Sequence, residues 1–317
     1  MTVRAIAASC SLAVVVTTAP VAAQSSVSSG PTDRVQRHHY AIDGRIRPLL
    51  FFWISRSNVG EAVVTTRRSA DVVGHSLLIG TDPDRAPRRL NRWGYIDEEV
   101  HGASATLIGL MTESNEDSLE EAEANAQKRT GERTFKTIRS SIAGDQAISV
   151  VTSIAAPADY SFREVHTVLD LAEHKWPTGA RRVVDLPAGT RPGFLIALAE
   201  LMHAHVDQWR TSGRVEPHTR IEFVYHGKLY QLGATRTQPV SSIRVGGATY
   251  VHVIVSQFAV RNMQDGAVTQ FSMTYGTEGS LSETPIAVTY QPRWWLQIEL
   301  TLDDSSQDAA PAVRPDP

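Results

Sequence analysis

The chain has 317 residues, a formal net charge of −3 and a single cysteine, Cys10. This slightly acidic balance argues against nucleic acid as a partner, because nucleic-acid binding requires a concentrated basic surface. A chain of this length buries a sufficient core without disulfide bonds, and one cysteine cannot form a disulfide within its own chain.

The first 23 residues have the pattern of a secretory signal peptide. Arg4 precedes an apolar stretch over residues 5–16, and small residues lead up to Ala23. The stretch is shorter than the roughly 20 apolar residues that span a bilayer, which favours a cleaved signal over a membrane anchor. We therefore expect export, to the periplasm or as a secreted protein, and no membrane-spanning segment in the mature chain.

Composition divides the remaining chain into one domain and two polar extensions. Residues 24–34 are rich in Ser, Gly and Pro, which predicts a flexible lead-in. Residues 303–317 have the same character and predict a disordered tail. A single domain is expected over residues 35–302, since no internal repeat and no long linker interrupts it.

The first third of this domain has the composition of β-strands. β-branched residues dominate residues 59–67, glycines bound residues 74–80, and residues 103–110 are a further short apolar segment. Residues 48–54 are continuously apolar, which predicts burial on both faces or a contact surface. Turn-forming residues separate the segments at positions 43–44, 58–60 and 82–84.

The middle third predicts three helices. Ser118 and Glu121 form a capping box for the first, which Gly131 would end, and Ser161 with Glu164 forms a capping box for the second. The third is expected over residues 192–209, where apolar residues recur at helical spacing: Leu195, Leu198, Met202, Val206 and Trp209.

The last third returns to strands, expected at 221–225, 228–232, 250–258, 267–275 and 286–290, with tight turns at 226–227 and 265–266. Apolar and polar residues alternate over 294–302, which predicts a strand with one buried face. The order of strands, helices and strands predicts an α+β domain. Its mostly antiparallel sheet comes from both terminal thirds, and about three helices pack on one face.

The segment 82–95 holds the most distinctive cluster of charge, in a loop interrupted by prolines. Its arginines, with the tryptophan that follows them, could clamp a carboxylate or phosphate through bidentate contacts: Arg85, Arg88, Arg89, Arg92 and Trp93. Alternatively, the arginines pair with nearby acidic residues: Asp97, Glu98 and Glu99. The pairing interpretation is favoured.

A second candidate for ligand contact is Trp295, which falls on the polar register of the last strand. If the sheet curves, Trp295 and part of the cluster 51–53 could line an apolar groove.

Two helices carry sets of polar residues at ligand spacing. Glu200, His203 and Asp207 share one face of the third helix and are weak metal candidates, although a solvated ion-pair ladder explains them better. His166, Asp170 and His174 repeat on the second helix and are interpreted in the same way. No cofactor motif occurs, so no cofactor is expected.

These patterns favour a non-catalytic binding or structural protein whose cleft takes an apolar ligand or a protein segment. The alternative is an exported hydrolase that uses carboxylates and histidines of the helices, with or without a metal.

The signal-peptide pattern makes a direct prediction about processing. Cleavage after Ala23 leaves Gln24 as the first residue of the mature chain. Edman sequencing of the exported protein should therefore begin at Gln24, and an exported protein that keeps Arg4 would contradict the prediction.

Overall fold

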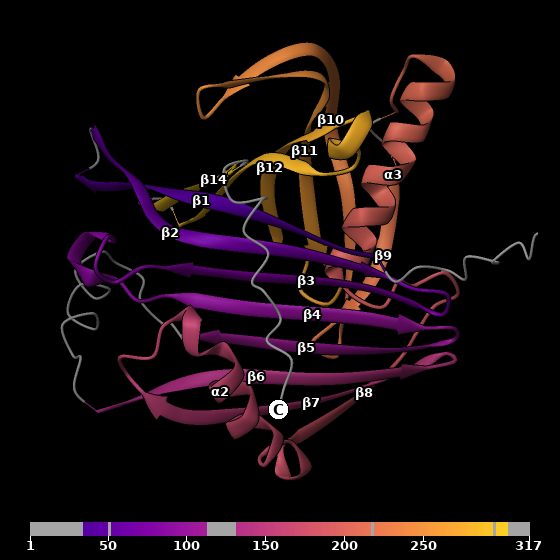
Figure 1. Cartoon of the computed structure of the whole chain (residues 1–317). Coiled ribbons are helices and arrows are strands. Elements are labelled where there is room, and N and C mark those ends of the chain that lie inside the picture. The colour runs from indigo at the N-terminus through magenta and orange to yellow at the C-terminus, as the bar shows by residue number, and fades with distance from the viewer. Residues whose placement is uncertain (1–33, 50–51, 113–130, 217–218, 294–295, 304–317) are drawn as a thin grey trace, which may run out of the picture. The chain divides into compact units, whose positions relative to one another are not determined.

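The structure is a computed structural model that describes residues 34–49, 52–112, 131–216, 219–293 and 296–303. These residues belong to one compact unit, Asp33–Pro317. They form one 14-stranded sheet with the order β8-β7-β6-β5-β4-β3-β2-β1-β14-β13-β12-β11-β10-β9 (Figure 1). The strands are β1 (Arg34–Leu49), β2 (Phe52–Arg68), β3 (Val72–Thr81), β4 (Trp93–His101), β5 (Ser104–Thr112), β6 (Glu132–Ala143), β7 (Gln146–Pro157), β8 (Ala180–Asp185), β9 (Arg220–Tyr225), β10 (Lys228–Val245), β11 (Ala248–Asn262), β12 (Val268–Gly276), β13 (Pro285–Arg293) and β14 (Leu296–Leu302).

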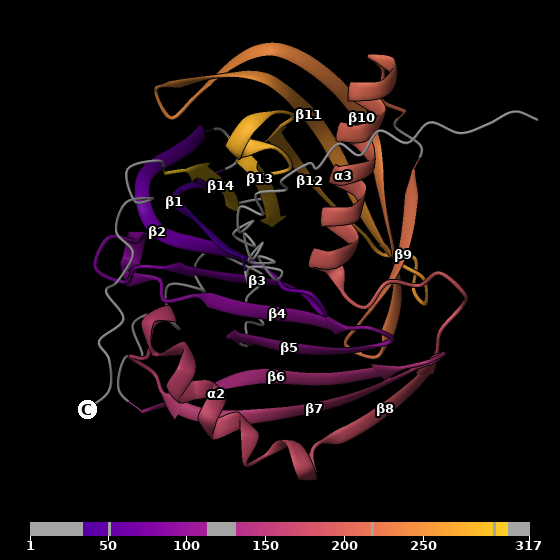
Figure 2. The same ribbon diagram turned by 45° about the vertical axis from the view of Figure 1, so that its right-hand side comes forward.

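Two α-helices lie on opposite faces of this sheet, as Figure 2 shows. They are α2 (Val165–Glu173) and α3 (Phe194–Ser212). Alternation along β4 separates the two faces, because Trp93 packs in the cluster with α2 whereas Glu98 contacts the beginning of α3. Four 3-10 helices complete this part of the chain: η1 (Pro87–Arg89), η2 (Phe162–Glu164), η3 (Trp176–Thr178) and η4 (Gly279–Leu281).

The predicted α+β class with about three helices is therefore wrong. The middle third contributes β6, β7 and β8 to the same sheet, and the described part of the chain has two α-helices. Residues 118–130 of the first predicted helix lie outside the described residues. The expected pairing between the two ends of the chain is present, since β1 pairs antiparallel with β14 with Ile42 opposite Leu300.

The hairpin of β6 and β7 explains why the middle third is not helical throughout. Ala143 pairs with Gln146, which leaves a two-residue turn of Gly144 and Asp145. Gly144 has φ +62°, the conformation that a glycine supplies at the first position of such a turn. The Gly-Asp pair was thus a local signal for a hairpin that the strand composition alone did not reveal.

Two of the predicted turns are bulges inside long strands. The register of β1 and β2 shifts between Ile42 and Gly44, and Asn58 takes φ +55° on the opposite strand. The backbone N–H of Asn58 donates to the Asp43 carboxylate at 2.8 Å, which fixes the bulge. Turn-forming residues therefore bend these two strands without ending them.

Most of the other local predictions are confirmed. The turn at His226 and Gly227 joins β9 to β10, and both residues have positive φ as a type I′ turn requires. Ser161 and Glu164 form the predicted capping box, which opens η2 directly before α2. The buried stripe of α3 includes the predicted Leu198, Met202 and Val206.

The main core lies between α3 and the sheet of β9 to β12. Leu201 of α3 and Phe258 of β11 are fully buried in it, and so is Tyr275 of β12, whose hydroxyl group is polar. A second cluster packs α2 against Phe135 and Trp93 on the other face. The sheet is thus covered by a helix on each face, over different strands.

Of the two alternatives predicted for the apolar run 48–54, burial on both faces is wrong for its two described side chains. Trp53 is 36% exposed and Ile54 is 47% exposed. Both belong to the hairpin of β1 and β2, close to the Leu49–Phe52 pair that ends it. Among the described residues, no helix has the length and apolar character to cross a bilayer.

The core under α3 predicts a contrast between two leucines. Leu201→Ala should lower the free energy of unfolding by about 2–5 kcal/mol, because it leaves a cavity at a fully buried site. The matched control is Leu171→Ala on α2, because Leu171 is 43% exposed. It should lower the free energy of unfolding by less than about 1 kcal/mol. Urea denaturation measures both, and equal losses would contradict the packing of α3.

Candidate functional site

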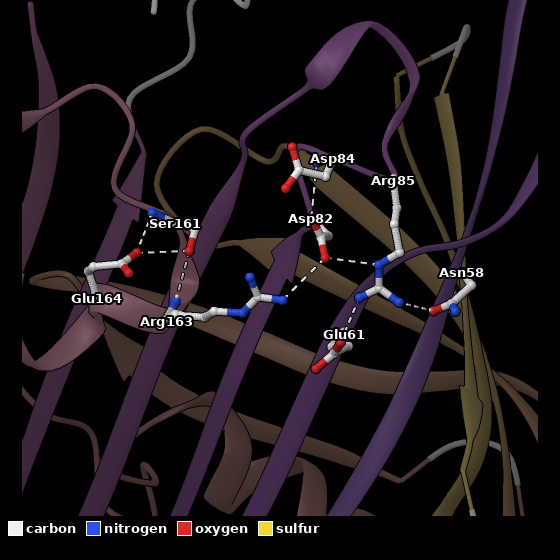
Figure 3. A network of polar contacts seen from close by, with 8 residues as sticks. All are labelled: Asn58, Glu61, Asp82, Asp84, Arg85, Ser161, Arg163 and Glu164. Atoms are coloured by element: carbon white, nitrogen blue, oxygen red, sulfur yellow. Dashed lines mark hydrogen bonds and ion pairs between the residues drawn. The ribbon is translucent and has the colours of Figure 1, made fainter.

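The arginine-rich loop after β3 is attached to neighbouring segments by hydrogen bonds and ion pairs. Figure 3 shows its centre, where the buried Asp82 accepts from Arg85 Nε at 2.9 Å and from Arg163 Nη2 at 3.2 Å. Arg85 also donates to Asn58 and to Glu61 of β2, both at 2.6 Å. Burial raises the pKa of Asp82, but the Asp84 N–H and Arg85 more than offset it, so the pKa is lowered.

These contacts connect β2, the loop and the segment before α2. Nε, Nη1 and Nη2 of Arg85 each donate to one of these residues, Asp82, Asn58 and Glu61, so the guanidinium group is held in place by the fold. Arg85 therefore pairs with the acidic residues Asp82 and Glu61, and not with the acids of β4 that the sequence suggested.

The other described side chains of this loop do not converge on one point. Trp93 is buried and donates from Nε1 to the Tyr160 carbonyl at 3.1 Å, so it belongs to the core. Burial and the neighbouring Arg133 lower the pKa of Arg92 to about 10. Arg89 is exposed, and the side chain of Arg88 lies outside the described residues, as does Trp295.

The polar rows on the helices do not converge on a metal. Arg191 pairs with Glu200 through two nitrogens, and His203 Nδ1 lies 2.7 Å from Glu283 Oε1. Asp207 is exposed one turn further along α3. Across the described ranges, no group of three or more His, Cys, Asp and Glu side chains is placed to hold a metal ion. On α2, His166, Asp170 and His174 are exposed.

Glu98 of β4 is the most buried carboxyl group that the structure describes, with no exposed surface. Its Oε1 accepts the N–H of Phe194 at 2.7 Å, and its Oε2 accepts the N–H of Ile196 at 2.9 Å. Burial raises the pKa of Glu98 to about 7, and the backbone N–H groups at the start of α3 limit that rise. Gly193 makes the approach possible, because a Cβ there would lie 2.3 Å from the Glu98 carboxyl group.

A second buried polar group tethers the other end of α3 to the sheet. His205 Nδ1 lies 2.7 Å from the Tyr275 hydroxyl, which lies 3.1 Å from Ser256 Oγ. All three side chains are fully buried, and burial lowers the pKa of His205 to about 4. These three side chains hold α3 on β11 and β12. The His205 imidazole is neutral there, and the group lies away from solvent.

A groove of about 610 Å³ extends from β10 to β14. It lies on the sheet face opposite α3, because Phe258 points into the core under α3 and Gln257 is the next residue of the same strand. Gln257 pairs with Ser272, and Ser272 pairs with Thr289, so polar side chains cross three neighbouring strands in one line.

Polar groups dominate the lining of this groove, which differs from the apolar cleft that the sequence led us to expect. They are Thr235, Gln257, Gln270, Ser272, Thr289, Gln291, Arg293 and Gln297. Among the lining residues that the structure describes, Arg293 carries the only charge. No sequence pattern reveals this set, because its members lie far apart in the chain and meet only through the pairing of strands.

No family model and no curated protein matches the sequence. A crystal structure of a β-barrel-like protein of a domain of unknown function from Brucella abortus is similar over 84% of this chain and 94% of that chain. The TM-score is 0.37 and the sequence identity 8%. A likeness at this level establishes neither a shared family nor a shared function.

The burial of Glu98 predicts a pH dependence of stability. A carboxyl group with a pKa of about 7 in the folded state and 4.5 in the unfolded state binds more protons when folded. Stability should therefore fall by about 3 kcal/mol as the pH rises from about 4.5 to about 7. Glu98→Gln should remove this fall, measured by urea denaturation at a series of pH values.

The control for this experiment is Glu99→Gln on the opposite face of the same strand, where the side chain is half exposed. This variant should keep the fall between pH 4.5 and 7. If Glu98→Gln keeps it as well, Glu98 is not the group whose protonation stabilises the fold.

Proposed function

We propose that this protein is a non-catalytic binding protein and that the groove on β10 to β14 takes a neutral, polar ligand. The observation that carries the proposal is the set of four glutamines and three hydroxyl side chains around about 610 Å³. That volume is within the range of small-molecule sites, roughly 300–1,000 Å³.

The chemistry of the lining defines the class of ligand. A glutamine amide both donates and accepts hydrogen bonds, and so does a hydroxyl group. Within the described chain, the amides of Gln257 and Gln270 make no hydrogen bond, so a ligand would replace only water there. Val268 and Pro292 add apolar contact area. Oligosaccharides of N-acetylated amino sugars combine hydroxyl groups, amides and apolar ring faces in this way.

The proposed place of action is outside the cytoplasm, in the periplasm or the medium. The support for this part is the signal-peptide pattern over residues 1–23. The alternative of an exported hydrolase has less support, because Glu200 and His203 pair with Arg191 and Glu283 and do not face one another.

The proposal is tested with a defined probe, the tetramer of N-acetylglucosamine, by isothermal titration calorimetry. The tetramer should bind the wild-type protein, and Gln257→Ala/Gln270→Ala should weaken binding about tenfold, since each lost hydrogen bond contributes about 0.5–1.5 kcal/mol. Gln238→Ala is the matched control, because Gln238 is an exposed glutamine of β10 outside the groove.

Two outcomes would contradict the proposal. One is that neither this tetramer nor maltotetraose, a neutral sugar oligomer without amides, binds the wild-type protein. The other is that the double variant and the Gln238→Ala control bind equally well, which would place the ligand elsewhere.

A further inference from the structure

The tight turn between β9 and β10, made by His226 and Gly227, lies against β7 and β8. A Cβ atom on Gly227 would lie 2.9 Å from Cβ of Arg182 and 3.4 Å from Cβ of Ser149. Arg182 Nη1 also donates to the His226 carbonyl at 3.5 Å. β8 and β9 are the two ends of the sheet order, and Figure 2 shows both on the same side of the molecule. The turn therefore brings the two ends of the sheet into contact.

The strands next to this turn carry polar side chains on the face that it covers. Ser149 pairs with Ser140 of β6 and with Arg182 of β8, and directly paired residues share one face. The Ser140 and Ser149 hydroxyl oxygens lie 2.7 Å apart and are buried. Lys136 is four residues before Ser140 in β6, so it lies on the same face. This face thus has two hydroxyl groups and two cations on three neighbouring strands.

The charges that act on His226 are all positive. Burial lowers the pKa of His226, and Lys136, Arg182 and Lys228 lower it further, to about 4. Lys228 is the first residue of β10 and follows the turn directly. His226 Nε2 is buried and has no hydrogen-bond partner among the described residues. The three cations and His226 therefore form a cationic cluster, which β6, β8, β10 and the turn bring together.

No carboxylate neutralises this cluster within the described ranges of the chain. None of the ion pairs there includes Lys136, Arg182 or Lys228, whereas Arg85, for example, pairs with Asp82 and Glu61. Neighbouring charges of one sign repel each other, and solvent screens this repulsion less where side chains are half-buried, as both lysines are. A bound anion would offset the repulsion.

We propose that this cationic cluster binds a phosphate group. The ammonium and guanidinium groups donate hydrogen bonds to its oxygens, and His226 Nε2 donates a further one. A phosphate monoester has three free oxygens and a charge of about −1.5 to −2, which matches three cations better than the single charge of a carboxylate. Arg182 is exposed, so the anion reaches the cluster from solvent. No residue of the cluster lines the groove on β10 to β14, so the two sites are independent.

The experiment is isothermal titration calorimetry of the full chain at about pH 7, in a buffer without phosphate. Inorganic phosphate should bind the wild-type protein, and the double variant Arg182→Gln/Lys228→Gln should bind it at least about tenfold more weakly, because it loses hydrogen bonds from two charged donors. Lys175→Gln/Arg244→Gln is the matched control, since it removes one exposed lysine and one exposed arginine outside the cluster. The control should bind phosphate as the wild type does.

Two further measurements separate binding from an effect on folding. Phosphate should raise the urea midpoint of the wild type and of the control more than that of the double variant, which reports the general effect of the salt. Phosphate should also shift the imidazole NMR signals of His226, which are identified by their loss in His226→Gln.

Two other ligands identify the form of phosphate that the site takes. If glucose 6-phosphate binds at least as tightly as inorganic phosphate, the site takes a phosphate group carried by a larger molecule. If inorganic phosphate binds and glucose 6-phosphate does not, the site takes the free ion. Acetate, which has one charge and two oxygens, should bind more weakly than either.

Three results would overturn the proposal. The first is that neither inorganic phosphate nor glucose 6-phosphate binds the wild-type protein. The second is that acetate binds as tightly as phosphate, since the cluster would then attract any anion. The third is that the double variant and the control bind phosphate equally well, which would place the anion elsewhere.

Discussion

The bond between Glu98 and the start of α3 is the constraint on which the arrangement of the two faces depends. A helix begins with backbone N–H groups that have no partner within the helix, and burying them without acceptors is costly. Here the acceptors come from a strand almost one hundred residues earlier in the chain, with Oε1 and Oε2 each bound to one N–H. The carboxyl group is buried by the same contact, so the helix and the strand each satisfy a polar group of the other.

This bond has consequences for the rest of the sheet. It fixes one end of α3 at β4, while His205 and Tyr275 hold the helix further along on β12. The buried stripe of α3 then covers β9 to β12 from one side only. The other side of these strands has no helix in the described chain, and polar side chains of β11 to β14 gather there into a groove. One face is therefore packed against a helix, and the other carries the groove.

Arginines occur in two different settings in this protein. In the loop after β3, Arg85 binds three residues and connects β2 to the segment before α2, which is a structural role. In the hairpin of β1 and β2, the Arg47 guanidinium lies 5.7 Å from the centre of the Trp53 ring, and Arg56 is exposed. The same residue type therefore connects separate segments through acidic partners in the loop after β3, and contributes positive charge to the hairpin of β1 and β2.

The sequence by itself determined the elements that have local signals. The capping box at Ser161 predicted the segment before α2, the stripe with Leu198 and Met202 predicted α3, and His226-Gly227 predicted a tight turn. These features depend on residues a few positions apart, so their cause is contained in a short segment. Turn-forming residues were less informative, because Asp43 and Asn58 form a bulge that only the pairing of β1 with β2 creates.

Features that depend on pairing between distant segments of the chain were decided only by the tertiary structure. The fold class differs from the predicted one because β6, β7 and β8 join the same sheet as the strands of the terminal thirds. No residue spacing within 132–185 shows which strands they pair with. Glu98 was expected to pair with arginines of the nearby loop and instead caps a helix from β4. The glutamines of the groove come from four strands, and cross-strand register, which depends on the packing of the whole sheet, brings them together.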